Sequence, residues 1–492
     1  MRARTLMVQG TASHVGKSLL TAAFCRILTQ EGYRVAPFKA QNMSLNAAVC
    51  DGGEIGRAQA LQAAACRRTA TVDMNPLLLK PCGSGGCQLI VQGQPAGFIK
   101  AAEHGRYPAA IVAAVEQSFE RLATSHDVVV LEGAGSPAEV NLLDRDIANM
   151  WMAERADAPV LLVGDIERGG VFASLLGTWL LVPQATRIRG FLINKFRGDA
   201  SLLTPGLEFL RQRTGVPVLG VVPYGDPQLP EEDSLGLANR RMEGDGLQIG
   251  VVRLPHLANF TDFEPLQRHP GVTLRYVATV EELQQVHVVI VPGTRSTVDD
   301  LAWLRGTGLA DALRRRAGAA TPVLGICGGF QMLGASIADD HGVESREPLT
   351  AGLGLLPVRT RFDRDKVTDH VTVALLGTEE RGPAYRIHHG RVMREDGAAL
   401  FHIQDAQGQL SDEGSRRGRT WGTTLHGIFD DPGVRQHILR MWAAWCGVRL
   451  PEQGETKDDL DVRLDAWAGW VRQAVAVPEI LALTGVAGGR SA

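Results

Sequence analysis

The stretch LMVQGTASHVGKSLLTA, residues 6–22, decides the fold of the first part of the chain. A short apolar strand leads into a glycine-containing loop, and a helix with an apolar face follows it. The usual phosphate-binding pattern is G-x-x-x-x-G-K-[ST], whereas five residues separate Gly10 from Gly16 here. Glycines at these positions let backbone N–H groups surround phosphate oxygens at the positive end of the helix. We therefore predict a lengthened phosphate-binding loop shaped by Gly10 and Gly16.

The two residues after Gly16 have the side chains that such a loop needs. Lys17 can reach the β- and γ-phosphates of a nucleotide, and the hydroxyl of Ser18 can bind Mg²⁺. The alternative is a glycine-rich turn that happens to precede Lys-Ser. The order strand, loop, helix favours a nucleotide site over that alternative.

Further apolar runs indicate that this loop belongs to a parallel sheet. They are DVVVLEGAG (127–135), APVLLVGD (158–165), IRGFLINKF (188–196) and GVPVLGVVPY (215–224). Continuous Val, Leu and Ile runs are typical of strands that helices cover on both faces. Ligands of such sheets bind beyond the carboxyl ends of the strands, where these runs reach Gly, Asp, Glu or Asn.

A polar segment rich in Gly and Pro, residues 225–246, divides the chain. After it the strand pattern restarts with LQIGVVRLP, VTLRYVA, VHVVIVPG and TPVLGICGG. The predicted fold class is therefore α/β, with two doubly wound domains. We place the nucleotide-binding domain at 1–235, a second α/β domain at 248–446, and a C-terminal tail with a last helix at 447–492.

Composition excludes several classes of function. The chain has 492 residues and a net charge of -3, so no nucleic-acid-binding surface is indicated. Seven cysteines, an odd number in a long chain, argue against a disulfide framework. The longest apolar stretch, residues 171–183, is too short to span a membrane, and no signal peptide precedes the loop. We expect a cytoplasmic enzyme without a membrane partner.

Several acidic residues are candidates for Mg²⁺ binding and catalysis. Glu132 ends a predicted strand, and Glu54 begins a predicted helix after a loop. Either could instead be a plain surface or helix-start carboxylate. Asp144 and Asp146 follow Glu132 closely. Because packed acids are unfavourable unless they face cations, we expect at least one of them to be catalytic.

Three other polar residues lie at strand ends. Lys39 is a cation suited to a phosphoryl group in transfer. Asn194 and Lys195 could hold an adenine ring. A solvated strand end without a ligand is an equally open interpretation for all three.

The segment TPVLGICGGFQMLG predicts a nucleophile in the second domain. A strand is followed by a sharp Gly-x-Cys-x-Gly turn and then a helix, which is the pattern of a nucleophile elbow. Gly325 and Gly329 allow the tight turn, and Cys327 lies at the helix N-terminus, where the dipole stabilises a thiolate.

A cysteine nucleophile needs a base, and His426 in LHGIF is the first candidate. It follows the cysteine by about 100 residues at the end of a predicted strand, so both can reach one edge of the sheet. His388 and His389 remain alternatives. The loop VPGTRST, residues 291–297, could donate a backbone N–H to an oxyanion.

These motifs together resemble known families. GTASHVGKS is similar to the lengthened loop of dethiobiotin synthetase and its relatives, and GICGGFQMLG with LHGIF resembles class I (triad-type) glutamine amidotransferases. The wider set PFKAQNMSLN, EIGRAQALQA, LLDRDIANM, DIERGGVFASLLGT, NKFRGD and LPHLANFTDFEPL resembles the glutamine-hydrolysing cobyric acid synthase family over residues 4–446.

The resemblance implies a reaction. ATP, with Mg²⁺, would activate the b, d, e and g carboxylates of adenosylcobyrinic acid a,c-diamide, and glutamine or ammonia would supply the nitrogen. Cys327 would be the nucleophile and His426 its base, while Asp146 would act near the substrate carboxylate. The remaining implied contacts are phosphate binding by Gly10, Thr11, Gly16, Lys17 and Ser18, and magnesium binding by Ser18, Glu54 and Glu132.

The chain departs from the full triad pattern at one position. Triad-type amidotransferases carry Glu two residues after the histidine, and Ile428 stands there instead. Asp430 is near in sequence, but no sequence pattern assigns it to the histidine. Alternative functions are a cobyrinic acid a,c-diamide synthase, a partition-type switch ATPase, and a binding module with an inactive cysteine.

Overall fold

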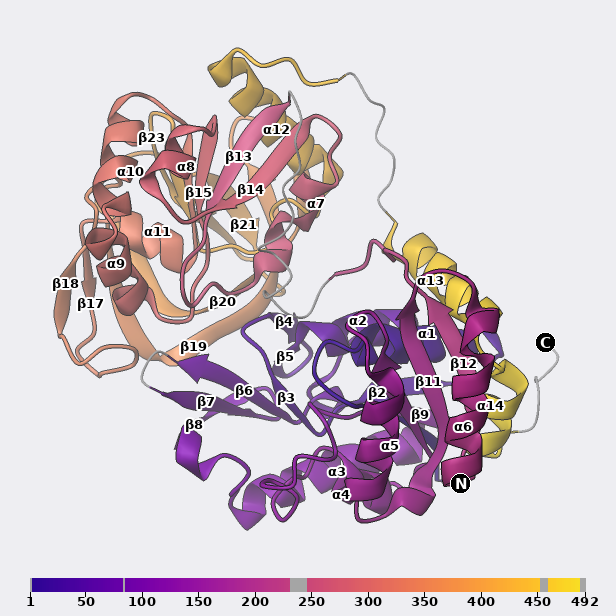
Figure 1. Cartoon of the computed structure of the whole chain (residues 1–492). Helices are drawn as coiled ribbons and strands as arrows, with labels where there is room; N and C mark the ends of the chain where they lie inside the picture. Colours follow the sequence, from indigo (N-terminus) through magenta and orange to yellow (C-terminus); the bar gives the residue numbers. More distant parts are fainter. Residues whose placement is uncertain (1, 83–84, 231–245, 452–458, 487–492) are drawn as a thin grey trace.

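The first of two α/β bodies is built on a parallel sheet (Figure 1). The computed structural model describes residues 2–82, 85–230, 246–451 and 459–486. The strands of this six-stranded sheet follow the order β12-β11-β10-β1-β9-β2, and every neighbouring pair is parallel. Their bounds are β1 (Arg4–Gly10), β2 (Val35–Phe38), β9 (Val128–Glu132), β10 (Val160–Asp165), β11 (Ile188–Phe196) and β12 (Val218–Pro223).

Helices cover both faces of this sheet, as the apolar runs predict. They are α1 (Lys17–Gln30), α2 (Arg57–Ala65), α3 (Ala109–Ser125), α4 (Met150–Arg155), α5 (Val171–Leu181) and α6 (Thr204–Thr214). Within β1, Leu6 and Val8 belong to one core cluster and Met7 to the other, and all three are fully buried. The doubly wound parallel fold predicted for this region is confirmed.

A smaller, mainly antiparallel region interrupts this body between β2 and α3, in which only the pair β3–β6 is parallel. A four-stranded sheet has the order β3-β6-β7-β8, and β4 pairs with β5 in a separate hairpin. The bounds are β3 (Gln41–Met43), β4 (Ala47–Cys50), β5 (Gly53–Gly56), β6 (Leu77–Cys82), β7 (Gly86–Val91) and β8 (Gln94–Lys100). No pattern in the sequence predicted this region.

The second body carries a six-stranded sheet with the order β14-β13-β15-β16-β24-β23, in which only β23 runs antiparallel to its neighbour. Its strands are β13 (Leu247–Val252), β14 (Val272–Val277), β15 (Val288–Val291), β16 (Val323–Ile326), β23 (Ser415–Arg417) and β24 (Thr420–Thr423). Its helices are α7 (Glu264–Gln267), α8 (Val280–Gln284), α9 (Thr297–Gly306), α10 (Leu309–Gly318), α11 (Gly328–Leu333) and α12 (Pro432–Cys446).

A second sheet in this body extends toward the first body. It has the order β18-β17-β19-β21-β22, with β20 paired to β19 in a long hairpin. Its strands are β17 (Ser336–Ala338), β18 (Leu349–Ala351), β19 (Val358–Leu375), β20 (Arg381–Arg394), β21 (Phe401–Gln404) and β22 (Leu410–Glu413).

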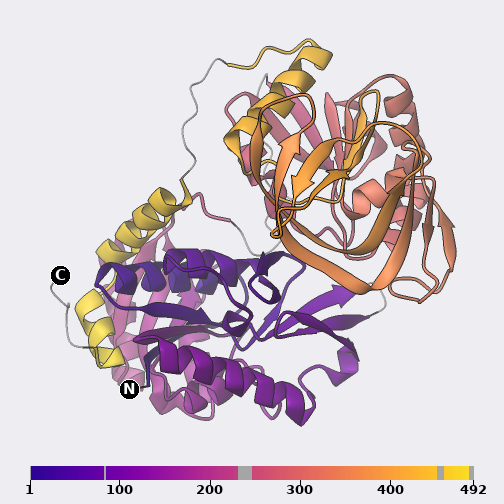
Figure 2. The same ribbon diagram turned by 180° about the vertical axis from the view of Figure 1, so that it is seen from behind.

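The long hairpin places the two bodies in contact (Figure 2). The ring Nε2 of His370 on β19 lies 3.2 Å from the carbonyl oxygen of Val49 on β4. The backbone N–H of Ala47 donates to the side chain of Asn259, at 3.0 Å. Tyr385 of the hairpin packs in one apolar cluster with residues of β4, β6 and β7. The interface therefore contains both apolar packing and buried hydrogen bonds.

The chain returns to the first body after the second is complete. Helices α13 (Leu460–Ala474) and α14 (Val477–Thr484) lie along the first body, where α13 packs on α1 (Figure 1). The buried guanidinium of Arg26 on α1 pairs with Asp461, and the indole N–H of Trp467 donates to the carbonyl of Leu19, at 2.8 Å. The segment predicted as a tail with one helix is thus, in its described part, two helices integral to the nucleotide-binding body. Of the helices that the structure describes, none has the length and apolarity needed to cross a bilayer.

Candidate active sites in the two bodies

The loop between β1 and α1 is held by its own backbone and by the end of β11. Gly16 has a φ of 101°, and a Cβ there would lie 2.2 Å from the amide nitrogen of Asn194. That nitrogen donates to the carbonyl of Val15, at 2.8 Å. In the structure Asn194 therefore supports the loop, and it is not among the described residues that line the adjacent cavity. This differs from the adenine contact that the sequence suggested.

The start of the loop continues the sheet. The backbone N–H of Thr11 donates to the carbonyl of Val163, at 2.9 Å. At Gly10, a Cβ would lie 2.5 Å from the side chain of Val15, so this glycine allows the loop to fold back on itself. The ammonium of Lys195 donates to the carbonyl of His14, at 2.7 Å, and pairs with Asp165. The loop is thus fixed by contacts with two neighbouring strands, β10 and β11.

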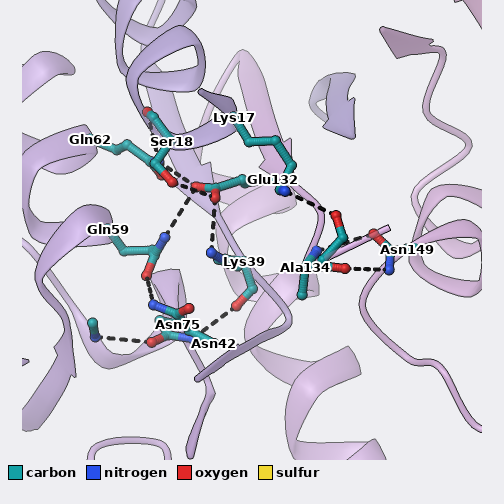
Figure 3. Close-up of polar contacts among 12 residues, drawn as sticks. Lys17, Ser18, Lys39, Asn42, Gln59, Gln62, Asn75, Glu132, Ala134 and Asn149 are labelled. Atoms are coloured by element: carbon teal, nitrogen blue, oxygen red, sulfur yellow. Dashed lines mark hydrogen bonds and ion pairs between the residues drawn. The ribbon is translucent and has the colours of Figure 1, made fainter. Parts of the chain in front are cut away.

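A buried carboxylate lies beside the helix N-terminus (Figure 3). Glu132, at the end of β9, is 1% exposed. Its Oε1 accepts hydrogen bonds from Ser18 Oγ at 2.7 Å and from Lys39 Nζ at 2.9 Å. Its Oε2 accepts from the amides of Gln62 at 2.6 Å and Gln59 at 3.3 Å, both on α2. The hydroxyl and carboxylate oxygens predicted to bind magnesium therefore lie in direct contact.

The ammonium of Lys17 spans the mouth of the same loop. It donates to the carbonyl oxygens of Ala12, at 2.8 Å, and Gly135, at 2.9 Å. Both acceptors are backbone groups, so the ammonium charge is not neutralised by them. Its position at the mouth of the loop suits contact with a phosphate group.

Asp146 faces the same cavity and is held by a hydrogen-bonded turn. Its carboxylate accepts from the backbone N–H of Ala148 at 2.7 Å and from the side-chain amide of Asn149 at 2.7 Å. The Asn149 amide also bonds both backbone groups of Ala134. Burial raises the pKa of Asp146, and the hydrogen bonds from Asn149 and Ala148 oppose that shift. The carboxylate is thus presented in a fixed orientation.

One cavity of about 610 Å³ joins most of the predicted residues of this body. Its lining includes Gly16, Lys17, Ser18, Lys39, Glu132 and Asp146. Polar groups from the loop after β1, the start of α1, the residue after β2, the end of β9 and the 134–149 segment meet here, at the carboxyl edge of the sheet. The cavity is large enough for a nucleotide and part of a second substrate.

Glu54 lies elsewhere, at the interface between the bodies. Its carboxylate is fully buried and pairs with Lys80 on β6 and Lys366 on β19. Burial would raise the pKa of Glu54, but the two lysines outweigh burial and lower it to about 2. The structure does not bring Glu54 together with Ser18 and Glu132. The surroundings of Glu54, which pairs with two lysines away from the phosphate-binding loop, do not support the magnesium role that the resemblance implied.

The turn between β16 and α11 is the predicted elbow. Cys327 has a φ of 49° and a ψ of -111°, a backbone conformation that residues other than glycine rarely adopt. At Gly329, a Cβ would lie 2.0 Å from the carbonyl oxygen of Val291, and at Gly325 it would lie 2.7 Å from the Cα of Phe330. Close backbone contact on both sides therefore holds the thiol at the end of the strand.

His426 is the histidine that approaches this thiol. A Cβ placed on Gly293, in the VPGTRST loop, would lie 2.9 Å from His426 Cε1 and 3.7 Å from Cys327 Cβ. The ring Nδ1 of His426 lies 2.6 Å from Oδ2 of Asp262, a buried residue of the short 3-10 helix η6 (Phe260–Phe263). Tyr385 stacks on the ring with centroids 5.3 Å apart. Cys327, His426 and Asp262 therefore form a chain of contacts that runs from thiol to imidazole to carboxylate.

The electrostatics of this series favour a charged imidazole. Burial lowers the pKa of His426, but the carboxylate of Asp262, its hydrogen bond and the Cys327 thiol together raise it to about 10. The other oxygen of Asp262 accepts from the backbone N–H of Gly427, at 3.2 Å. Asp262 is therefore held on the imidazole by a second contact, which fixes the ring orientation.

The other candidates for this role have different surroundings. His388 and His389 line the same cavity as Cys327, but burial lowers their pKa values to about 3 and about 4. Asp430 is buried close to Gly427, and within the described structure it makes no hydrogen bond to His426. The orienting acid is Asp262, whose only sequence signal was a lone Asp in LPHLANFTDFEPL, a segment already singled out for its resemblance. Sequence reasoning also missed Gln59 and Gln62, two neutral residues within a helix.

The geometry defines a class of protein: a P-loop nucleotide-binding body joined to a glutamine amidotransferase body with a cysteine nucleophile. Residues 6–235 match the CobQ/CobB/MinD/ParA nucleotide binding domain family, and residues 248–434 match the CobB/CobQ-like glutamine amidotransferase domain family.

Relatives over nearly the full length narrow this class. The chain is 51% identical to a cobyric acid synthase of Sorangium cellulosum over 470 residues, which covers 89% of this chain and 90% of the relative. It is 45% identical to that of Syntrophobacter fumaroxidans, covering 99% of both chains, and 44% identical to that of Moorella thermoacetica, covering 98% of both. The chain belongs to the cobyric acid synthase family, whose members are glutamine-dependent ligases of cobalamin biosynthesis.

Proposed function

We propose that this chain amidates the b, d, e and g carboxylates of adenosylcobyrinic acid a,c-diamide, with ATP as the activating substrate and glutamine as the nitrogen donor. The observation that carries the proposal is the presence of two complementary sites in one chain. Ser18, Lys39 and Glu132 surround the end of a phosphate-binding loop, while Asp262 and His426 serve a cysteine elbow.

The first site supplies a leaving group. A carboxylate does not react usefully with ammonia at neutral pH, because oxide is a very poor leaving group. Transfer of the γ-phosphoryl group to the substrate carboxylate gives an acyl phosphate and ADP, and phosphate then leaves readily. Lys17 and Lys39 stabilise the charge on the phosphoryl group during transfer. Asp146 helps to position the substrate carboxylate in the same cavity.

The donor atoms near the loop suit magnesium. The hydroxyl of Ser18 and the carboxylate of Glu132 are hard oxygen ligands in direct contact at the helix N-terminus. When bound there with ATP, Mg²⁺ would neutralise phosphate charge. Lys39 and the two amides on α2 keep the Glu132 carboxylate oriented toward Ser18.

The second site releases ammonia from glutamine. The Cys327 thiolate attacks the side-chain amide carbon, and the imidazolium of His426 protonates the departing nitrogen. Ammonia leaves and a thioester remains. His426 then takes a proton from water, which attacks the thioester and releases glutamate. Asp262 keeps the imidazole in the required tautomer and stabilises its charged form.

Ammonia must reach the acyl phosphate before it is protonated or lost to solvent, so we include a guarded path between the bodies. The test is isotopic. Enzyme given glutamine with a ¹⁵N amide and an excess of unlabelled ammonia should yield product that is enriched in ¹⁵N. Full dilution of the label by the ammonia pool would overturn the guarded path.

Mass spectrometry of the product tests the reaction itself. The a,c-diamide, ATP and glutamine should give four successive mass changes, each equal to replacement of OH by NH₂. Unamidated cobyrinic acid under the same conditions should not be amidated at its a and c groups. If those groups are amidated and the a,c-diamide is unchanged, the chain is an a,c-diamide synthase instead.

A further inference from the structure

A hairpin of the first body supports the frame of the glutaminase site. The backbone N–H of Ala47, at the start of β4, donates to the side-chain oxygen of Asn259, at 3.0 Å. Asn259 has a φ of 52° and directly precedes η6, the short helix that carries Asp262. Tyr385, whose ring stacks on His426, belongs to one apolar cluster with Ala47. The supports of both the orienting acid and the imidazole therefore border the first body.

The same hairpin leads into α2, whose first residue is Arg57. Helix α2 begins immediately after β5, and the backbone N–H of Arg57 donates to the carbonyl oxygen of Asn46, the residue before β4, at 3.1 Å. The start of α2 is therefore held beside the strand that contacts the second body. Further along the same helix, Gln59 and Gln62 bind the carboxylate of Glu132 at the phosphate-binding loop. One helix of the first body thus borders both candidate sites.

Arg57 brings a positive charge to a cluster of acidic groups in the second body. Burial lowers the pKa of the partly buried Arg57, but neighbouring groups of the second body outweigh burial and raise it. These groups are Tyr385, Asp430, Asp262 and Glu264. Burial raises the pKa of Asp430 to about 6, and the charge of Arg57 is the largest influence that opposes this shift. A cation of the first body thus faces the acids beside the catalytic histidine.

Two of these acids approach the residue that follows His426. One oxygen of Asp262 accepts from the backbone N–H of Gly427, at 3.2 Å. A Cβ placed on Gly427 would lie 3.0 Å from Oδ2 of Asp430, so both carboxylates approach the same turn. Two carboxylates that share a site disfavour ionisation of both, unless a cation compensates them. Because Asp262 must be ionised to stabilise the charged imidazole, this pair requires such a cation.

Other cations near the pair have a weaker influence on it. Arg268 Nη1 lies 3.5 Å from Oε2 of Glu264, and Arg435 donates to the backbone carbonyl of Asp430, at 3.2 Å. Both arginines lower the pKa of Asp430, but each does so less than Arg57. The main compensating charge for the acids of the glutaminase therefore comes from the nucleotide-binding body.

We propose that Arg57 is a positioning residue of the glutaminase site, where its guanidinium compensates Asp262 and Asp430 and so keeps Asp262 ionised against His426. The inference rests on the proposed glutaminase role of Cys327 and His426. Arg57 is not among the described residues that line the cavity of Cys327. It acts through Asp262 and not on glutamine, so it affects the rate of the chemistry and not the binding of the substrate.

Replacing Arg57 in the full chain tests this assignment. Arg57→Met keeps the apolar stem but removes the charge, so Asp262 and Asp430 should share a proton. Glutaminase kcat at neutral pH should fall at least about tenfold, which corresponds to an apparent pKa of the pair about one unit above the assay pH. The KM for glutamine should not change, and Arg57→Lys should keep most of the rate. Arg68→Met, at an exposed arginine shortly after α2, is the matched control.

A second substitution distinguishes charge from packing. In the Arg57→Met background, Asp430→Asn removes the competing carboxylate and should restore most of the glutaminase kcat. The acid limb of the pH–rate profile should move to higher pH in Arg57→Met, because loss of the cation raises the pKa of the acid pair, and it should return in the double variant. If Arg57→Met does not fold, the double variant decides: a kcat near that of wild type supports the role, and a low kcat overturns it.

Ammonia-dependent amidation separates this role from general damage to α2. Arg57→Met should keep that activity, because Gln59 and Gln62 still hold Glu132. An unchanged glutaminase kcat, a lack of rescue by Asp430→Asn, or an equal loss of the ammonia reaction would overturn the positioning role. Failure of the wild-type enzyme to use glutamine at all would instead overturn the proposed function.

Discussion

The two bodies each place their chemistry at a junction between a central strand and the following helix, but the two junctions differ in length. Residues 11–16 separate β1 from α1, whereas Cys327 alone separates β16 from α11. The longer connection leaves room for phosphate oxygens within its backbone. The single-residue connection holds a thiol at a φ of 49°. The length of the connection thus decides whether the helix N-terminus serves a bound anion or a side chain.

The junctions also differ in where their partners come from. The contacts of Ser18 and Lys17 shown in Figure 3 all come from the first body. Cys327 depends on His426 and Asp262, from two other segments, and its cavity is closed by the other body. The nucleotide site is therefore locally assembled, whereas the glutaminase site is assembled by the fold as a whole. We therefore expect that mutations can abolish the glutaminase activity without abolishing ATP-dependent activation.

The largest expected effect is at the elbow. Cys327→Ala should lower glutamine-dependent amidation by about 10⁶-fold, the typical cost of removing a nucleophile. Ammonia-dependent amidation should remain, since the first site is unchanged. Steady-state rates with each nitrogen source measure both effects, and Cys446→Ala serves as a control at a half-buried cysteine of the same body. Loss of the ammonia reaction would mean that the two junctions are not independent.

Replacing Asp262, the acid that orients His426, should have the next largest effect on the glutaminase rate. Asp262→Asn should lower the glutaminase rate by about 10⁴-fold, because the amide favours the wrong tautomer of His426. Asp430→Asn is the matched control, since Asp430 lies nearby without bonding the imidazole. The two variants are compared by the rate of glutamate release in single turnovers. Equal rates for the two variants would remove Asp262 from the catalytic series.

Replacing Lys17 in the phosphate-binding loop should slow amidation with either nitrogen source. Lys17→Ala should lower amidation by about 10²- to 10³-fold with glutamine and with ammonia alike, because charge in phosphoryl transfer is no longer stabilised. ADP formation coupled to product formation is the measurement, with Lys100→Ala as control. A variant that loses only the glutamine reaction would contradict the assignment of the two sites.

The smallest effect concerns pH. Since Asp262 raises the pKa of His426 to about 10 in the folded state, while an unfolded histidine titrates at about 6.5, this pair stabilises the fold fully below about pH 6.5. The stabilisation declines as pH rises and is lost above about pH 10. Between pH 6.5 and 8 we expect a loss of about 2 kcal/mol in wild type.

Urea unfolding of the second body measures this difference. The wild type should lose stability over that interval, whereas Asp262→Asn should lose much less, because its histidine is no longer held in the charged form. A change at the exposed His402, such as His402→Gln, should leave the pH dependence as in wild type. Parallel pH profiles for wild type and the Asp262 variant would show that the pair does not carry the charge.

The sequence predicted the parts of the fold and site that depend on local patterns. Continuous apolar runs identified the two parallel sheets, and the glycines around Lys17 and Cys327 identified both junctions, because backbone geometry leaves a short-range signal. Asp262 and the partners of Glu54 lacked such a signal. Asp262 meets His426 across 164 positions, and Lys366 meets Glu54 across 312. Such contacts arise from the docking of elements, which no local pattern specifies.

The same reasoning explains the different outcomes for two buried acids. Glu132 and Glu54 each follow a glycine-rich or apolar stretch, and each faces a lysine. Glu132 ends a strand adjacent to β1, so its neighbour is the loop hydroxyl. Glu54 ends up in the inter-body contact, because the hairpin β4–β5 leads away from the sheet and meets β19. A carboxylate at a predicted strand end or helix start is therefore, by itself, a weak indication of a metal ligand.

The return of α13 and α14 to the first body has a consequence for biosynthesis. The second body is formed by the uninterrupted segment 246–451, so it can fold as soon as that segment leaves the ribosome. The first body must wait, because α1 buries Arg26 against Asp461 and Leu19 bonds Trp467. We therefore expect the earlier-synthesised body to reach its native state last, so that the phosphate-binding helix becomes fully covered only when the donor of ammonia is already folded.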